Sequence, residues 1–476
     1  MQFNSYEFIL LFLPLLLAGY FLLNRLNYTL GKIFLAGMGA AFYLYYGVQS
    51  AALLLFSLLF NYAAAALIAR REGASKLVLT LDIMLNVGLL LFFKYTNFFL
   101  ETLDPWLRTG ARLNLFLPLG ISFFTFQQIS YVLSVREKGR NETVLNYLLY
   151  ILFFPKLIMG PLAEPDELIP QFDDAARKRL SPENLACGAK LFCFGLFKKM
   201  ILADTFFAAA EWGFAQFPEA TSAELFLTML AYTFEIYFDF SGYSDMAVGV
   251  AQMLNIDLPI NFDSPYRALS IRDFWKRWHI SLTSFLTKNV YYPLGGNRRG
   301  TGRQYLNIML VFLVSGIWHG ANWTFILWGL LHGALSVLER MRERAGRRLN
   351  DSAGWLGTFL SVNVLWLLFR AESVRQWLSM LKTMLLFKST AVSEGLLKCF
   401  EIPESAVLLQ LFRLSSIRGA MALLFYVAAL LLCLLPENNY RRKDSLTLSG
   451  AVLAAAAFFF AFLHLGGESV FVYFNF

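Results

Sequence analysis

The sequence lacks charge. Only 16% of its 476 residues are Asp, Glu, Lys or Arg, whereas soluble domains carry about a quarter. Hydrophobic residues make up 57% of the chain, and 48 residues are phenylalanine. The apolar residues form blocks long enough for membrane-spanning helices, each of which needs about 20 residues. A soluble globular protein is therefore excluded, and the sequence predicts an all-α polytopic membrane protein.

Cysteine is also scarce, and the four cysteines show no metal-ligand spacing. Most of them lie in or beside apolar runs, where cysteine behaves as a small hydrophobic residue. We therefore expect neither a disulfide framework nor a metal site. P-loop, GxGxxG and nucleophile-elbow motifs are missing too. The first apolar block has no basic segment before it and no cleavage site after it, so we expect a retained span rather than a signal peptide.

We expect roughly ten to twelve spans, with re-entrant and interfacial helices among them. The candidate spans are Tyr6–Leu23, Ile33–Val48, Ala52–Ile68, Val78–Phe93, Tyr147–Leu162, Leu191–Phe207, Leu225–Phe240, Tyr305–Ile317, Trp323–Leu338, Trp355–Phe369, Ala420–Leu435 and Leu446–Leu463. They are expected to form one membrane domain, residues 1–476, made of N-terminal helices (1–163), a catalytic core (164–340) and C-terminal helices (341–476).

Basic residues mark the expected cytoplasmic side of the membrane, where Lys and Arg accumulate in short loops. The net charge is +8, and clusters lie at 70–76, 198–199, 298–303 and 441–443. In this setting the positive charge indicates topology and not a nucleic-acid partner. The first seven residues contain no Lys or Arg, so the N-terminus is predicted to be extracytoplasmic. The last span follows the cytoplasmic cluster at 441–443, so the C-terminus is predicted to be extracytoplasmic too.

The segment SIRDFWKRWHISL, residues 270–282, is predicted to form one helix. Ser270 and Asp273 fit the Ser-x-x-Asp capping pattern at its start. Apolar residues recur at helical spacing along one face: Ile271, Trp275, Trp278, Leu282 and Phe285. Arg272, Lys276 and Arg277 occupy the remaining surface. A basic helix with a Trp-rich face is typical of the membrane–water boundary, which favours an interfacial anchor.

The four histidines all lie in or beside apolar runs: His279, His319, His332 and His464. An ionisable residue within a span is a functional candidate. His319 follows thirteen mostly apolar residues, which places it about 20 Å into the bilayer, where only a protein-lined cavity suits it. Imidazole is the usual general base for a hydroxyl group. For His332 and His464, a hydrogen bond to a neighbouring helix is the alternative.

Two other groups of charged residues have less specific patterns. Glu235 and Asp239 share one helix face, Asp245 follows an expected helix break at Gly242, and all three are expected to pair with bases or to fix that break. The arginines of the loop LGGNRRGTGR are candidates for phosphate binding: Arg298, Arg299 and Arg303. The positive-inside rule accounts for the same arginines without a ligand.

Several segments together resemble the membrane-bound O-acyltransferase superfamily, and within it the bacterial alginate and peptidoglycan O-acetylation branch. They are RDFWKRWHISL, YYPLGGNRRG and SGIWHGANWTFILWGLLHG, supported by LPLGISFFTFQQISY, FFPKLIMGPL and FDFSGYSDMAVG. The resemblance runs nearly end to end and rests on the combination of motifs. It implies helices around a central tunnel with a deep histidine, here His319, and an upstream Asn, Asp or His, here His279.

The resemblance also implies an activity. A cytoplasmic donor, acetyl-CoA, gives an acetyl group that crosses the bacterial inner membrane to an extracytoplasmic polysaccharide. A secreted or membrane-anchored esterase-like acetyltransferase is the implied partner, and no cofactor is permanently bound. His319 would be the base and His279 would orient the donor or stabilise charge on its carbonyl. The loop arginines would lie near the coenzyme A phosphates.

The chain end FVYFNF contains Tyr473, just past the last candidate span. The related teichoic-acid alanylation system uses a C-terminal tyrosine as an acyl carrier, so Tyr473 is either such a carrier or an aromatic-belt residue. Three other functions stay open: D-alanyl transfer to teichoic acid, transport of an acyl donor or lipid-linked sugar without chemistry, and a purely structural role beside an enzyme.

Overall fold

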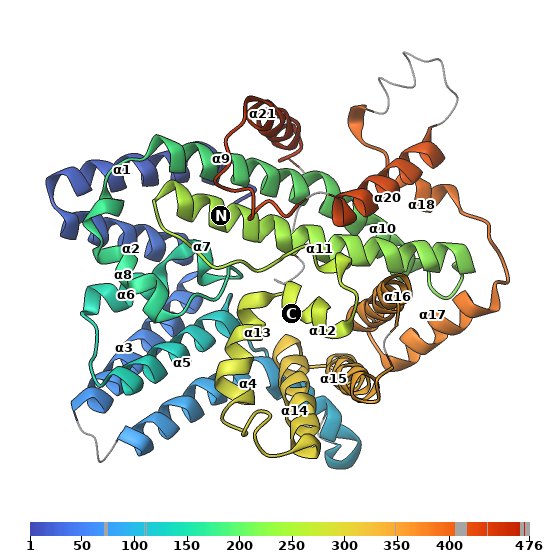
Figure 1. Cartoon of the computed structure of the whole chain (residues 1–476), viewed down its shortest axis with the longest axis horizontal. Helices are drawn as coiled ribbons and strands as arrows, with labels where there is room; N and C mark the ends of the chain where they lie inside the picture. Colours follow the sequence, from blue (N-terminus) through green and yellow to red (C-terminus); the bar gives the residue numbers. More distant parts are fainter. Residues whose placement is uncertain are drawn as a thin grey trace. The chain divides into compact units, whose positions relative to one another are not determined.

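The computed structural model describes residues 1–70, 75–108, 110, 112–347, 349–404, 417–435, 437–466 and 471. Helices make up 76% of the structure and no strand occurs in these ranges (Figure 1). An isolated β-bridge joins Phe262 and Trp278. The prediction of an all-α protein is confirmed.

The chain folds into two compact units, each of which combines segments that are distant in sequence. The first contains Met1–Leu196, Tyr243–Ile260 and Lys443–Phe458, and the second contains Phe197–Gly242, Asn261–Arg442 and Phe459–Phe476. All four histidines belong to the second unit. The expected single domain with its three segments stays a prediction.

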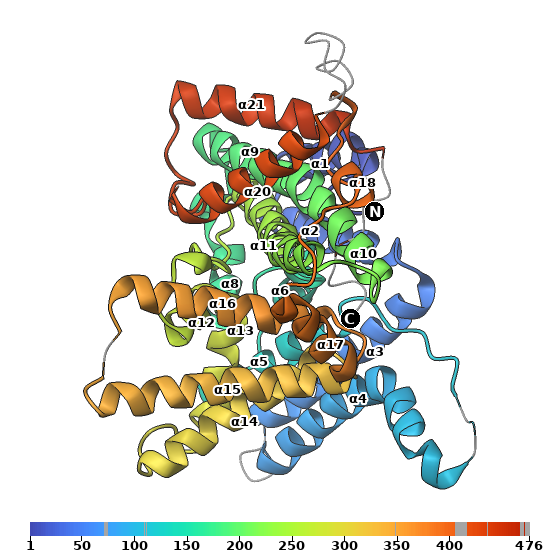
Figure 2. The same cartoon turned by 90° about the vertical axis from the view of Figure 1, so that its right-hand side faces the viewer.

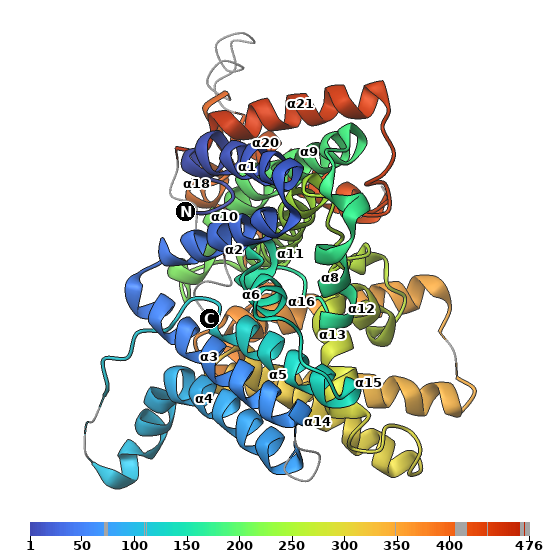
Figure 3. The same ribbon diagram turned by 90° about the vertical axis from the view of Figure 1, so that its left-hand side faces the viewer.

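Ten helices of the described residues begin in the first unit. They are α1 (Leu13–Leu26), α2 (Tyr28–Leu44), α3 (Val48–Arg70), α4 (Ser75–Leu107), α5 (Ile121–Lys138), α6 (Val144–Leu152), α7 (Phe154–Leu157), α8 (Pro165–Asp173), α9 (Pro182–Phe197) and α21 (Leu448–Leu463). Figure 3 shows α3, α4 and α5 packed side by side. Buried amides join α3 to α4, where Asn86 Nδ2 donates to Asn61 Oδ1 at 2.8 Å. Such side-chain hydrogen bonds hold helices together where lipid supplies little hydrophobic driving force.

Four helices within the described ranges are long and apolar enough to span a membrane. They are Phe8–Leu26, Val48–Arg70, Ser75–Trp106 and Asp351–Arg370, and three shorter apolar helices occupy Tyr28–Leu44, Arg418–Leu434 and Leu448–Leu463. The first of these carries strongly exposed leucines, including Leu11 at 68% and Leu26 at 72%. A contiguous apolar surface of this kind suits lipid. The polytopic membrane architecture is confirmed, and the total of ten to twelve spans stays a prediction.

The other helices begin in the second unit. They are α10 (Asp204–Gln216), α11 (Ser222–Met253), α12 (Ile271–Arg277), α13 (Ile280–Leu286), α14 (Thr301–His319), α15 (Trp323–Arg344), α16 (Asp351–Arg370), α17 (Val374–Leu386), α18 (Glu394–Lys398) and α20 (Arg418–Leu434). Figure 2 shows α14 and α15 running alongside each other, with α16 next to α15. Helices α14 and α15 and the α12–α13 segment carry three of the four histidines, His319, His332 and His279.

Two local predictions are wrong. Helix α11 continues without a break past Gly242 to Met253. The chain is also helical through Lys198 and Lys199, since a π-helical turn, Lys198–Ala203, joins α9 to α10 where a basic loop was expected. Lys199 is only 1% exposed and pairs with carboxylates, so it is an internal charge and does not mark a cytoplasmic loop.

Candidate functional site

The α14–α15 hairpin positions His319 at its turn. His319 is the last residue of α14, and α15 begins four residues later after Asn322, whose side chain accepts a hydrogen bond from Thr324 N at 3.0 Å. Gly316 and Gly329 allow the two helices to approach closely. A Cβ atom at Gly316 would lie 2.4 Å from the carbonyl oxygen of Phe325. The segment SGIWHGANW thus combines close packing of two helices with the turn that joins them.

The segment around His279 differs from its prediction. Ser270 Oγ accepts from Asp273 N at 3.0 Å, so the expected N-terminal cap is confirmed. The single helix, however, is interrupted after Arg277, and His279 takes a left-handed backbone conformation with φ 44° and ψ 52° before α13 begins. The interruption is held by Asn261, whose backbone oxygen accepts from Ile280 N at 3.0 Å. Side-chain periodicity carries no information about this long-range partner.

The tryptophans of this segment do not lie at a membrane surface. Trp275 is 8% exposed and Trp278 is 1% exposed. Trp278 stacks on Phe274 with ring centroids 5.5 Å apart, and its ring also approaches Trp366 of α16 at 4.8 Å. The interfacial-anchor interpretation is therefore wrong for the Trp-rich face, because that face is packed against other helices of its own unit.

Aromatic rings enclose His319, which is 4% exposed. Its ring centroid lies 4.8 Å from that of Trp318, 5.2 Å from that of Trp328 and 5.1 Å from that of Phe369, with all three contacts edge to face. The three neighbours come from α14, α15 and α16. This arrangement fixes the imidazole in a largely apolar surrounding, as a base sequestered from water requires.

Trp318 is a shared neighbour of the two predicted catalytic histidines. Its ring centroid lies 6.1 Å from that of His279, which also packs against Phe240 at 4.7 Å. His279 is 1% exposed, and burial lowers its pKa to about 3. At neutral pH the imidazole of His279 is therefore uncharged, so it can position or polarise a group by hydrogen bonding but does not act as a cation.

His332 also contacts Trp328, with ring centroids 4.8 Å apart. Its Nδ1 atom accepts a hydrogen bond from Trp275 Nε1 at 3.2 Å. This bond joins α12 to α15 and accounts for His332 by the structural alternative. A neutral imidazole that accepts at Nδ1 carries its proton on Nε2. We assign His332 a supporting role behind Trp328.

A cavity of about 240 Å³ opens beside this aromatic cluster. Its lining comes from α12, α13, α14, α15 and the π-helical turn Thr287–Tyr291: Arg272, Trp275, Lys276, Leu282, Thr283, Leu286, Thr287, Tyr291, Ile308, Val311, Phe312, Ser315, Ser336 and Arg340. We call this space the basic cavity, because three cations line it and no carboxylate does. Ser315 precedes His319 by one helical turn on the same face of α14, so the cavity wall ends one turn before the histidine.

Sequence reasoning did not identify two residues of the basic cavity, Ser336 and Arg340. Both lie on α15, some sixty residues beyond Arg272 and Lys276 of α12, and only the fold brings them together. The Ser336 hydroxyl is buried without a hydrogen-bond partner among the described residues. A buried polar group of this kind is available to a ligand.

The loop arginines occupy a different place. Arg298, Arg299 and Arg303 are exposed and do not belong to the lining of the basic cavity. Arg303 lies in the first turn of α14, and the preceding loop with Arg298 and Arg299 is fixed by Asn307, whose Nδ2 donates to the carbonyl oxygen of Gly296 at 2.9 Å. Phosphate binding by these arginines stays a prediction, and the basic cavity offers a second set of cations for the same task.

Three buried or partly buried charged residues form an ion triad, and one of them, Asp239, directly precedes Phe240 in the sequence. Lys199 Nζ is 2.7 Å from Asp239 Oδ1 and 2.8 Å from Asp204 Oδ1. The expectation that Asp239 pairs with a base is confirmed. Lys199 Nζ also lies 4.5 Å above the ring of Phe471, a buried residue near the chain end. Tyr473 itself falls outside the described residues.

Two remaining candidates have limited roles. His464 follows α21, and its Nδ1 lies 2.8 Å from the carbonyl oxygen of Phe460, one helical turn earlier. This bond lies within its own helix and is not the expected hydrogen bond to a neighbouring helix, but His464 Nε2 also lies 3.5 Å from Glu404 Oε2, a carboxylate of a segment distant in the sequence. Within the described ranges no group of three His, Cys, Asp or Glu residues is placed to hold a metal ion.

Comparison with known proteins places this arrangement in a family. Residues 135–381 match the model of MBOAT, the membrane-bound O-acyltransferase family. A peptidoglycan O-acetyltransferase of Helicobacter pylori is 37% identical over 100% of this chain and 97% of its own length. A probable alginate O-acetylase, AlgI, of Pseudomonas aeruginosa is 36% identical over 83% of this chain and 76% of its own.

A more distant relative bears on the choice among acyl groups. A teichoic acid D-alanyltransferase of Streptococcus thermophilus is 27% identical over 53% of this chain and 67% of its own length. The O-acetyltransferases are thus both more similar to the chain and matched over more of it. The chain belongs to the membrane-bound O-acyltransferase family, in its bacterial O-acetyltransferase branch.

Proposed function

We propose that the chain takes an acetyl group from cytoplasmic acetyl-CoA and delivers it across the bacterial inner membrane for O-acetylation of a polysaccharide. The observation that carries this proposal is the position of His319, buried among aromatic rings one helical turn beyond the wall of the basic cavity. The relatives that act on peptidoglycan and alginate support an extracytoplasmic polysaccharide as the final acceptor. Both chain termini lie on the extracytoplasmic side in this proposal.

The basic cavity is the proposed entry for the donor. Its volume is below the roughly 300–1,000 Å³ of pockets that enclose whole ligands, so it suits the extended pantetheine arm and not the nucleotide. Arg272, Lys276 and Arg340 would hold phosphate oxygens at its mouth. The buried Ser336 hydroxyl would bond an amide of the arm. Arg298, Arg299 and Arg303 are the alternative set for the phosphates.

His319 is the proposed general base. An acceptor hydroxyl gives its proton to the imidazole while its oxygen attacks the acetyl carbonyl carbon. The C–S bond of the thioester then breaks, and the CoA thiolate leaves and takes up the proton. The neutral His279 would orient the donor carbonyl through a hydrogen bond. The aromatic enclosure would exclude water and so limit hydrolysis of the thioester.

Tyr473 is the proposed first acceptor, which would pass the acetyl group to an esterase-like acetyltransferase partner. The contact between Phe471 and Lys199 supports this assignment, since it brings the chain two residues before Tyr473 to the ion triad beside Phe240. A phenol with an ordinary pKa near 10 is an adequate nucleophile when a base assists. The alternative for Tyr473 is an aromatic-belt residue at the membrane surface.

The proposed function predicts loss of ester-linked acetate in cells that lack the chain. Acetate and D-alanine released by mild alkali from isolated peptidoglycan and exopolysaccharide would be measured before and after restoring the wild-type chain. We expect acetate to fall to background and to return on restoration. A change in D-alanine with constant acetate would instead establish alanyl transfer. Constant levels of both would favour a transporter or structural role.

A charge reversal tests the mouth of the basic cavity. Lys276→Glu should raise the KM for acetyl-CoA about tenfold, because it removes one attractive charge and adds a repulsive one. The measurement is acetyl transfer by the purified complex of the chain and its partner at varied acetyl-CoA. Lys382→Glu on α17 is the matched control, since Lys382 is also exposed and lies outside the cavity lining. Equal KM values for acetyl-CoA in the two variants would contradict phosphate binding at the basic cavity and favour Arg298, Arg299 and Arg303 as the phosphate-binding residues.

A further inference from the structure

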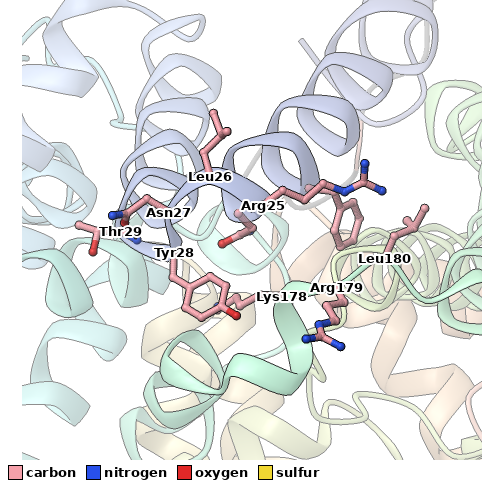
Figure 4. Close-up of a pocket in the computed structure, with 10 residues that line it drawn as sticks. Arg25, Leu26, Asn27, Tyr28, Thr29, Lys178, Arg179 and Leu180 are labelled. Carbon is pink, nitrogen blue, oxygen red and sulfur yellow. Dashed lines mark hydrogen bonds between the residues drawn. The ribbon is translucent and has the colours of Figure 1, made fainter.

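A second, larger cavity lies in the first unit, where α1 ends and α2 begins. Its volume is about 910 Å³, and its lining is Phe21, Asn24, Arg25, Leu26, Asn27, Tyr28, Thr29, Lys178, Arg179 and Leu180. Figure 4 shows Arg25 on the last turn of α1 and Lys178 and Arg179 on the segment that faces it. We call this space the α1–α2 cavity. It shares no lining residue with the basic cavity.

The α1–α2 cavity has a surplus of positive charge. Arg25, Lys178 and Arg179 line it, and no carboxylate does. Among the described residues, no ion pair engages Arg25 or Arg179. The nearby carboxylate of Asp173 pairs with Lys32 and also accepts from Asn146 Nδ2 at 2.8 Å. An anion in the cavity would therefore meet two arginines that no ion pair engages, and Lys178, whose charge is partly balanced by Asp173 and Asp174.

Lys178 is the buried member of this group. It is 3% exposed, and its Nζ lies 3.4 Å from the Tyr20 hydroxyl and 5.9 Å from the centre of the Tyr20 ring. Burial, with a smaller contribution from the charge of Lys32, lowers the pKa of Lys178 to about 8. Holding a mostly protonated ammonium at this depth costs free energy, and an anionic ligand would recover part of it.

The floor of the cavity is a rigid helix turn. Asn27 has an extended backbone, and its Oδ1 accepts from Thr29 N at 2.7 Å, which caps the start of α2. Asn24 is buried against Gly31, where a Cβ atom would lie 2.3 Å from Asn24 Oδ1. The cap and this close packing fix the angle between α1 and α2, so the cavity does not depend on a mobile loop.

An exposed apolar surface leads to the α1–α2 cavity. Only about a third of the candidate span Phe8–Leu26 is buried. Its outward leucines continue to the cavity rim, with Leu22 at 60% and Leu26 at 72% exposure, and Leu180 on the facing segment is 48% exposed. The cavity thus lies where a lipid-facing helix ends, which is the depth of phospholipid headgroups.

We propose that the α1–α2 cavity binds an anionic phospholipid, with its phosphate headgroup among Arg25, Lys178 and Arg179 and its acyl chains along the exposed leucines of α1. Basic pockets at the headgroup level between membrane helices are suited to such lipids. A free phosphate would satisfy the cations equally well, but it would leave the apolar rim uncovered. The lipid is a structural ligand in this proposal and takes no part in acyl transfer.

Lipid binding by the purified full-length chain tests the proposal. The double variant Arg25→Gln, Arg179→Gln should bind phosphatidylglycerol about thirtyfold more weakly than wild type, since each surface cation contributes about a fivefold gain in affinity for an anionic headgroup. Native mass spectrometry with phosphatidylglycerol, and with zwitterionic phosphatidylcholine as reference, gives the affinity ratio. Both arginines are exposed, so the variant is expected to fold.

The control variant removes two positive charges from another part of the first unit. Arg136→Gln, Arg140→Gln changes two exposed arginines outside the cavity lining and should leave phosphatidylglycerol binding within about twofold of wild type. Equal weakening in both double variants would overturn the proposal in favour of general surface charge. A rise in melting temperature with inorganic phosphate equal to that with phosphatidylglycerol would also overturn it, since the ligand would then be the phosphate ion. Neither result depends on acyl transfer.

Discussion

Replacing His319 with alanine should lower acetate transfer to polysaccharide by about 10²–10⁴-fold, the usual contribution of a general base. The side chain is enclosed by Trp318, Trp328 and Phe369, and no other histidine contacts all three of these rings among the described residues. A water molecule in the space left by the imidazole would be a poor substitute, because it lacks a pKa near neutrality. The measurement is alkali-released acetate in cells with matched amounts of membrane-inserted protein.

The control for His319→Ala is His464→Ala, the same substitution outside the aromatic enclosure. His464 has a local contact with Phe460, so its loss should leave acetate transfer within about twofold of wild type. Full acetate release with His319→Ala would assign this histidine a structural role and favour the transporter alternative.

The variant His319→Ala also tests whether Tyr473 carries the acetyl group before it reaches the partner protein. Mass spectrometry of the C-terminal peptide should detect an acetyl adduct on Tyr473 in wild-type protein trapped during turnover and none in His319→Ala. Absence of an adduct in trapped wild-type protein, with acetyl transfer intact, would exclude the relay and leave a sugar hydroxyl as the direct acceptor.

Replacing Lys199 with methionine should destabilise the protein by about 3–5 kcal/mol, the usual effect of breaking a buried ion pair from one side. Two carboxylates share this lysine. Without its ammonium, Asp239 at 1% exposure would face Asp204 with no cation between them. The readout is the thermal unfolding midpoint in detergent, with the amount of folded protein recovered from membranes.

The relative losses of stability in a set of variants test whether Lys199 is shared by both carboxylates of the triad. Asp239→Asn leaves the Lys199–Asp204 pair in place, so it should cost less than Lys199→Met. The double variant Lys199→Met, Asp239→Leu should recover part of the stability, because it removes both buried charges at once. Lys198→Met changes the adjacent, half-buried lysine and is the control. A larger loss from Asp239→Asn than from Lys199→Met would contradict the assignment of Lys199 as the shared cation.

Local features of the second unit were predictable from sequence because their determinants are close in the chain. The Ser270 cap depends on a residue three positions away, and the hairpin at His319 depends on glycines within ten positions of it. Composition and apolar block length were likewise sufficient for the all-α membrane fold. Such features follow from neighbouring residues, whatever the rest of the fold.

The features that sequence analysis missed depend on partners distant in the chain. The sequence pattern assigns Lys199 to a basic cytoplasmic loop. Its ion-pair partner Asp239 lies forty positions later, and nothing in the sequence identifies the two residues as a pair. The expected single helix over 270–282 is broken by hydrogen bonds to Asn261, and Trp275 is buried against α15 and does not lie at a membrane surface. The basic cavity combines α12 with Ser336 and Arg340 of α15, and no spacing rule connects those segments.

The left-handed backbone at His279 restricts which amino acids can occupy this position before any chemistry is considered. Outside glycine, the residues enriched at such angles are Asn, Asp and His, and these are the same three that the family resemblance implies at the upstream site. β-Branched residues would be strained there by about 1–3 kcal/mol. The backbone conformation at position 279 therefore limits the amino acids that fit there. The residues that the resemblance implies at this site satisfy the shape of the main chain as well as the demands of catalysis.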